Sequence, residues 1–201
     1  MQLMKRNVIL LALLALFVCG CQNDSPQDVK GFYEYFVKHL CGDYVLSDVH
    51  WSGTPVDLDG NGTAANSLLQ MEYSHLLGCF EPKNKAEIVN AAFVSGNLPA
   101  LAVNVELPYP QYSKGEAGWS VSGLSYLPMT IHLLYRNMEM ASETFSFQEK
   151  ENPMSFVEGI AEICVTESTP EKLVLRLHCH MCDLVSGKLT KNYLYYTYVR
   201  R

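Results

Sequence analysis

From Lys85 to the end of the chain, apolar and polar residues alternate with a period of two, and turn residues interrupt the pattern at intervals of about eight to twelve residues. Successive side chains of a strand point to opposite faces, so this period is typical of strands with one buried face. The pattern predicts a mainly β domain, built as an antiparallel barrel or a barrel-like sandwich. The expected strands are 87–94, 98–106, 119–124, 130–136, 143–148, 156–166, 172–182 and 189–199.

The last two of these strands show the clearest alternation. Five apolar side chains share one face of residues 172–182, and Arg176, His178 and His180 share the other. Ser186 and Gly187 then supply the turn of a hairpin. The apolar face consists of Leu173, Leu175, Leu177, Cys179 and Met181.

The region before Lys85 predicts two helices and one strand. Ser25 and Pro26 are typical of a helix start, apolar residues then recur at helical spacing up to Leu40, and Gly42 is a plausible stop. A strand is expected over 44–51 and a second helix over roughly 64–77.

The first 21 residues carry a targeting pattern. Lys5 and Arg6 precede an apolar run over 8–18, which is too short to span a bilayer and is typical of a signal peptide. Gly20 followed by Cys21 resembles the lipobox of bacterial lipoproteins. That resemblance implies cleavage after residue 20 and acylation of Cys21, which would hold the protein on a membrane. Because Gln22 follows the cysteine, the same resemblance favours the outer membrane, with the side left open.

The expected organisation is therefore a signal peptide over 1–20, a lipidated tether over 21–25 and one β domain over 26–201. The formal net charge of −6 becomes about −8 when Lys5 and Arg6 are removed. A surface this acidic repels nucleic acid, so no nucleic-acid partner is expected.

Cysteine usage leaves the disulfide pattern open. Acylation of Cys21 leaves an odd number of other cysteines after the signal peptide, so at least one thiol stays unpaired in the monomer. These five are Cys41, Cys79, Cys164, Cys179 and Cys182. An exported domain can form disulfides, but apolar neighbours are also typical of buried free cysteines.

Several short motifs together resemble the lipocalin-like lipoproteins of Bacteroidetes-type bacteria, most of which are domains of unknown function. They are the lipobox, the strand with Trp51, the loop over 56–62, a short helix ending near Cys79 and the tyrosine-rich last strand. This resemblance implies an antiparallel barrel or barrel-like sandwich with an apolar interior, and small barrels of this kind can hold one small ligand.

The loop with Asp57, Asp59 and Asn61 is a candidate calcium site. Oxygen-bearing side chains at alternate positions followed by a glycine match the first half of an EF-hand loop. The twelfth position, which should carry a bidentate carboxylate, is Leu68. In the alternative interpretation, Asp57 and Asp59 cap the following helix, and Gly60 and Gly62 only shape a turn.

Two further groups invite a binding interpretation. Imidazole and thiolate groups at His178, His180 and Cys182 could bind a metal, although the run continues the alternation of a core strand. Tyr109, Tyr112 and Trp119 fall in or beside a Pro-, Gly- and Ser-rich stretch, 107–118, which is expected to be a connection. Exposed aromatic rings there could stack on a sugar or contact a partner, and packing over the barrel mouth is the alternative.

No catalytic motif accompanies these groups. The chain has no Gly-x-Ser-x-Gly elbow and no cysteine and histidine in a recognised local frame, so we expect a protein that is not an enzyme. The expected function is that of an outer-membrane-anchored binding or accessory module for a small apolar or glycan ligand. The alternative is a structural or interaction lipoprotein that contacts an envelope protein and carries no ligand.

Overall fold

A computed structural model of the chain describes residues 26–69, 80, 84–94, 98–136, 139–147 and 159–201. The proposed signal peptide, the tether with Cys21, and Cys79 lie outside these residues. The chain separates into two units, residues 1–35 and residues 36–201. Helix α2 (Pro26–Leu40) crosses this boundary, and its bounds agree with the start and stop signals in the sequence.

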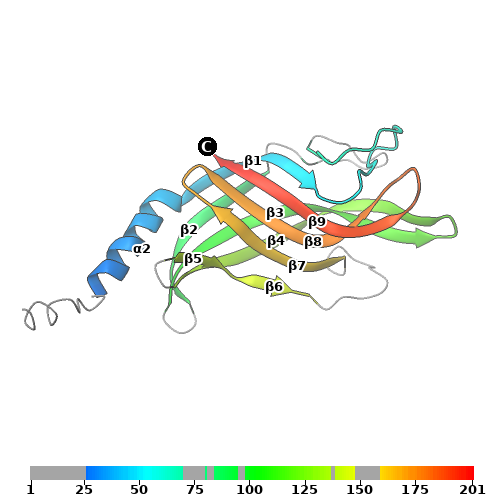
Figure 1. The fold of residues 1–201 in the computed structure, drawn as a ribbon. Coiled ribbons are helices and arrows are strands. Elements are labelled where there is room, and N and C mark those ends of the chain that lie inside the picture. Colours follow the sequence, from blue (N-terminus) through cyan, green and yellow to red (C-terminus); the bar gives the residue numbers. More distant parts are fainter. Residues whose placement is uncertain (1–25, 70–79, 81–83, 95–97, 137–138, 148–158) are drawn as a thin grey trace, which may run out of the picture. The chain divides into compact units, whose positions relative to one another are not determined.

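The second unit is an antiparallel sheet that closes into a nearly complete barrel (Figure 1). Its order is β5-β4-β3-β2-β1-β9-β8-β7-β6, and every neighbouring pair is antiparallel. This confirms the mainly β, antiparallel prediction. The strands are β1 (Gly42–Trp51), β2 (Lys85–Val94), β3 (Leu98–Gly115), β4 (Gly118–Arg136), β5 (Glu139–Ser142), β6 (Thr144–Ser146), β7 (Ile160–Ser168), β8 (Lys172–Cys182) and β9 (Leu189–Arg200).

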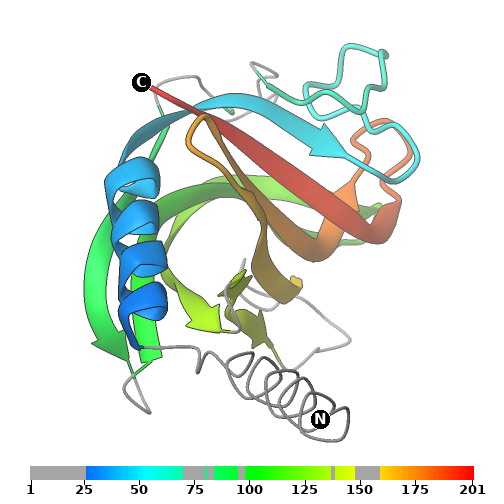
Figure 2. The same ribbon diagram turned by 60° about the vertical axis from the view of Figure 1, so that its left-hand side comes forward.

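The barrel closes where one short segment changes its partner. Residues 139–142 pair with β4, and residues 144–146 pair with β7 on the other side of the gap (Figure 2). Ser142 lies at the change: its Oγ accepts a hydrogen bond from the Val165 N–H at 2.8 Å and donates one to the Glu143 carbonyl at 2.7 Å. We call this meeting of β4, β5, β6 and β7 the seam.

The hairpin of β8 and β9 forms as predicted, with the predicted inner face on β8. Leu173, Leu175, Leu177, Cys179 and Met181 are all buried, whereas Arg176, His178 and His180 are partly exposed. Large aromatic side chains from several strands fill the space between the sheet faces. The largest fully buried ones are Trp51, Tyr44, Tyr109, Tyr196, Tyr198 and Phe80.

Two predictions about local structure are wrong. The second helix, expected over 64–77, is absent from its described part: Ala65, Ser67 and Leu69 form isolated bridges with Val56, His50 and Phe80 instead. Leu68 is buried there without a helical turn, because it donates its backbone N–H to the Val49 carbonyl. Residues 70–77 lie outside the described residues. Within the described ranges, α2 is the only helix.

The expected connection over 107–118 is instead the paired end of the long hairpin β3–β4, which turns between Gly115 and Gly118. Pro108 and Pro110 made this stretch resemble a loop. Strand β2 pairs with β3 only as far as Val105, so β3 has no β2 partner beyond that point. Proline, which lacks an N–H, is tolerated where a strand has a free edge.

Candidate functional site

A pocket of about 410 Å³ opens at the seam, at the end of the barrel where β7 ends and β8 begins. Apolar side chains form much of its wall, and hydroxyl and carboxylate groups complete it. The lining residues are Phe36, Leu133, Glu139, Met140, Ser142, Val165, Thr166, Glu167 and Ser168.

Strand register explains why these side chains converge. Leu133 is paired with Ser142, and Tyr135 with Met140, across β4 and β5. Directly paired residues of an antiparallel sheet place their side chains on the same face. Because Leu133 and Tyr135 are buried, this face is the inner one, and Ser142 and Met140 share it.

Two buried tyrosine hydroxyl groups near this pocket have no hydrogen-bond partner among the described residues. Tyr135 is 3% exposed and its ring lies 5.8 Å from that of Phe36, a residue of the pocket wall. Tyr198 is fully buried. It is paired with Leu173 of β8, and Leu173 is paired on its other side with Ser168 of β7, a residue of the pocket wall. Neither hydroxyl meets an acceptor or a donor in the described structure. Burial raises the pKa of both phenols, so both stay neutral.

Other buried tyrosines of the barrel show what is unusual about this pair. The hydroxyl of Tyr44 donates to the Leu40 carbonyl at 2.8 Å, that of Tyr109 to the His180 carbonyl at 2.7 Å, and that of Tyr196 to the Pro108 carbonyl. A buried polar group without a partner costs about 1–3 kcal/mol. Tyr135 and Tyr198 therefore offer unused hydrogen-bonding capacity near a pocket whose wall is partly apolar.

The aromatic residues predicted to bind a ligand do not form an exposed site. Tyr109 and Tyr112 are buried, their rings lie 6.1 Å apart, and both hydroxyls donate to the His180 carbonyl. Trp119 is partly exposed at the start of β4, with the Lys114 Nζ 5.6 Å from its ring centroid. The two tyrosines are thus core residues of the barrel, and the prediction of exposed rings is wrong for them.

The Asp57 loop is built around a buried carboxylate. Asp57 is 1% exposed, and its oxygens accept hydrogen bonds from the backbone N–H groups of Asp59, Gly60 and Gly62 at 2.6–3.1 Å. Burial alone would raise the pKa of Asp57, but these N–H groups and a side-chain hydrogen bond with Asp59 more than offset burial and hold the pKa below its ordinary value.

These contacts do not complete a calcium site. Asp59 and Asn61 accept backbone N–H groups within their own turn, and the twelfth position, Leu68, is a fully buried apolar residue. Among the residues that the structure describes, no three His, Cys, Asp or Glu side chains are grouped so that they could hold a metal ion. The loop therefore fits the turn of the alternative interpretation, but its aspartates do not cap a helix, because the described residues after the loop form none.

The His178–Cys182 stretch lies within β8 as an ordinary strand. His178 stacks on Tyr193 at 4.7 Å on the outer face, while Cys179 and Cys182 are buried. Burial raises the pKa of the Cys182 thiol to about 11 and raises that of Cys179 further. The four cysteines in the described part of the chain are all free thiols: Cys41, Cys164, Cys179 and Cys182.

Sequence reasoning did not identify the pocket residues. Phe36 and Leu133 fall within a predicted helix and a predicted strand, but nothing marked them as pocket residues. The pocket depends on the partner change at Ser142, which has no periodic signal in the sequence. Within the described ranges, no helix combines the length and apolar character needed to cross a membrane. Comparison with family models, curated proteins and solved structures finds no match to this chain.

Proposed function

We propose that the protein is a binding module, and not an enzyme, that holds one small ligand in the pocket at the seam. We further propose that lipid on Cys21 anchors it to the outer membrane. The observation that carries the proposal is a pocket with a partly apolar wall that lies near two buried tyrosine hydroxyl groups without a hydrogen-bond partner in the described structure.

The chemistry of the pocket favours a particular kind of ligand. Its volume of about 410 Å³ lies in the range of sites for small molecules, which are mostly apolar with a few placed polar groups. Phe36, Leu133 and Val165 would contact an apolar body, and a phenol hydroxyl would donate to a carbonyl or hydroxyl oxygen of the ligand. Glu139 in the wall disfavours an anionic ligand, whereas the charge of Glu167 is paired with Lys172 at 2.9 Å. A neutral, largely apolar molecule with a hydrogen-bond acceptor fits best.

The test uses the neutral ketone dye Prodan, whose emission shifts to the blue when it leaves water. We expect saturable binding to the wild-type protein. Met140→Trp should abolish it, because the larger side chain fills the pocket from β5. Tyr135→Phe should weaken it about three- to tenfold, because the ketone loses a hydrogen bond.

Val185→Trp is the matched control, because Val185 is 68% exposed in the turn between β8 and β9, remote in the strand register from the seam. It should bind Prodan like the wild type. Undiminished binding to Met140→Trp would place the dye elsewhere and refute the pocket proposal. Absence of Prodan binding to a folded wild-type protein would favour the interaction lipoprotein instead.

A further inference from the structure

The outer face of strands β1 to β4 carries a second, larger hollow that the proposed function does not use. This open depression of about 1080 Å³ is lined by side chains from the start of β1 and β2 and the middle of β3 and β4. We call it the outer depression. Its lining residues are Asp43, Asn84, Lys85, Ala86, Glu87, Asn104, Val105, Glu106, Tyr126, Pro128, Met129 and Thr130.

A row of polar side chains crosses the outer depression. Asp43 is paired with Glu87, Glu87 with Asn104, and Asn104 with Thr130, so these four side chains lie side by side on four successive strands. Neighbouring strands lie about 4.8 Å apart, so the row extends for about 14 Å. In the adjacent row, Glu106 is paired with Pro128.

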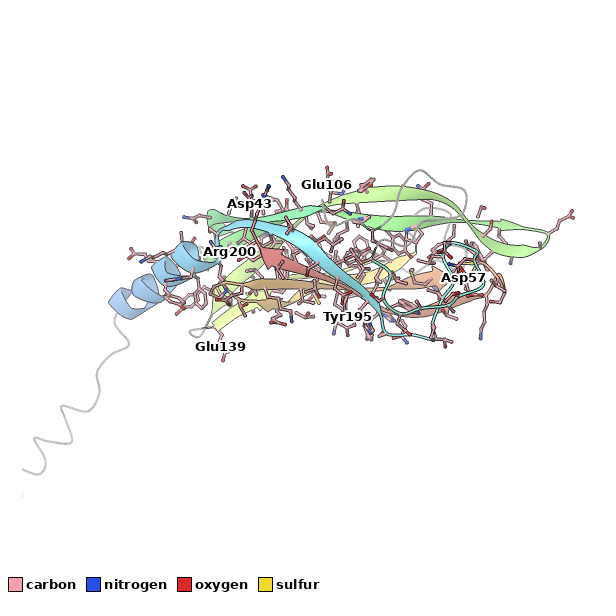
Figure 3. All side chains as sticks on the ribbon, turned by 90° about the horizontal axis from the view of Figure 1, so that it is seen from above. Asp43, Asp57, Glu106, Glu139, Tyr195 and Arg200 are labelled. Carbon is pink, nitrogen blue, oxygen red and sulfur yellow. The ribbon has the colours of Figure 1, made fainter. Side chains whose placement is uncertain are left out.

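The carboxylates of this surface are not neutralised. Asp43, Glu87 and Glu106 are exposed, and none of them has an ion-pair partner among the described residues. Lys85 is the one cationic side chain in the lining, so the three carboxylates outnumber it. Like charges placed directly opposite each other, as in the Asp43–Glu87 pair, destabilise a sheet. Figure 3 shows Asp43 and Glu106 on one side of the barrel and Tyr195 on the other. A cationic ligand would relieve this repulsion.

Two amide side chains add hydrogen-bonding groups. The Thr130 hydroxyl donates to Asn104 Oδ1 at 2.9 Å, which fixes the Asn104 amide and leaves its Nδ2 for another partner. The Nδ2 of Asn84, also in the lining, is buried and has no hydrogen-bond partner in the part of the chain that the structure describes. A buried donor in this state is stabilised when a ligand supplies an acceptor.

The aromatic group of the outer depression is Tyr126, which is 45% exposed. Its ring offers an apolar surface and a polar tip next to the exposed Pro128. The cores of protein interfaces are depleted in Glu, Asp and Lys and enriched in aromatic residues. A surface with one exposed aromatic ring among several charged and amide groups therefore fits a hydroxyl-rich ligand better than a protein.

We propose that the outer depression binds a carbohydrate chain that carries free amino groups. Ammonium groups would pair with Asp43, Glu87 and Glu106, ring hydroxyls would bond to Asn84 and Asn104, and one sugar ring would stack on Tyr126. This site is separate from the pocket at the seam, and the proposal does not depend on the function assigned to that pocket.

The test measures binding of two probes to the full-length protein by calorimetry at low ionic strength. The probes are a hexamer of β-1,4-linked glucosamine and its fully N-acetylated counterpart, which has the same backbone without the charge. We expect the glucosamine hexamer to bind at least about tenfold more tightly. The double variant Glu87→Gln/Glu106→Gln should reduce its affinity about tenfold, and Tyr126→Ala should weaken both probes.

The double variant Glu116→Gln/Glu171→Gln is the matched control, because it removes the same charge from exposed positions outside the outer depression. It should leave the affinity unchanged. If both double variants lost the same affinity for the glucosamine hexamer, binding would depend only on net charge, and the proposed site would be refuted. Equal binding of the acetylated hexamer would refute the amino-group specificity. If hexalysine bound more tightly than the glucosamine hexamer, and Tyr126→Ala did not change the affinity for hexalysine, the surface would bind a basic protein segment and the carbohydrate proposal would be refuted. Met140→Trp should not affect any of these measurements, so the two proposals fail independently.

Discussion

Asp57 is the only charged side chain that is fully buried among the described residues, and its neighbours explain why it is tolerated there. A buried carboxylate must be hydrogen-bonded, and three backbone N–H groups of its own loop supply that. Its backbone also joins two distant segments: the Asp57 N–H donates to Asp183 Oδ2 at 2.8 Å, and the Leu184 N–H donates to the Asp57 carbonyl. Asp57 thus ties the loop to the turn between β8 and β9.

We expect Asp57→Asn to reduce the free energy of unfolding by about 2 kcal/mol at neutral pH, because an amide nitrogen would face an N–H donor. The folded pKa of Asp57 lies below its unfolded value of about 3.9. The charged form therefore stabilises the fold above that value, and this contribution is lost as pH falls through the folded pKa. Urea unfolding followed by tryptophan fluorescence should show the difference from wild type shrinking below about pH 4.

Asp59→Asn is the control for this measurement. Asp59 is only partly buried and accepts hydrogen bonds from Asn61 within an exposed turn, so its replacement should cost less than about 1 kcal/mol. An equal effect of both substitutions would mean that burial of Asp57 does not set its contribution.

The seam is the element on which both barrel closure and the pocket depend. A strand that pairs with one neighbour at its start and with another at its end can bridge the two edges of a sheet, and Ser142 stands at the change. Its side chain replaces a ladder hydrogen bond by accepting the Val165 N–H. Edge strands otherwise leave such groups unpaired.

Ser142→Ala should therefore open the seam locally. The Val165 N–H loses its acceptor, which should cost about 1–2 kcal/mol. Hydrogen–deuterium exchange should show faster exchange at Val165, with little change at Leu175 in the neighbouring strand. Ser146→Ala, at an exposed position of β6, should leave the Val165 rate unchanged. A slow Val165 amide in Ser142→Ala would show that closure does not depend on this hydroxyl.

The elements also show how far the sequence predicts this fold. Residues 172–182 were predicted with their observed bounds, because a strand with one buried face has an unbroken period of two. The hairpin β3–β4 was predicted only in pieces, because Pro108 and Pro110 are typical of loops and the free edge that tolerates them is a property of the whole sheet. The pocket at the seam was not predictable, because it depends on which edges meet.

At the scale of the whole molecule, the two proposed sites use different faces of the same sheet. Strand β4 takes part in both: Leu133 faces the pocket, whereas Thr130 faces the outer depression. Buried tyrosines with satisfied hydroxyls, such as Tyr109 and Tyr196, occupy the interior between β3, β8 and β9. A ligand therefore finds space at the barrel end and on the outer surface. The net charge of −6 is consistent with preference for neutral or cationic molecules.

Binding on a membrane requires an anchor, and the proposed one depends on a single atom, the Cys21 Sγ. One acyl chain holds a protein only marginally, whereas the two chains of a diacylglyceryl group hold it firmly. Cys21→Ala should therefore move the protein from the membrane fraction to the soluble fraction, as measured by immunoblotting after ultracentrifugation. Because residue 21 lies outside the β domain, Prodan binding and the free energy of unfolding should not change. If Cys21→Ala stayed with the membrane, the lipid anchor would be ruled out. If it became soluble but lost Prodan binding, the ligand site would depend on the lipid and not on the pocket at the seam.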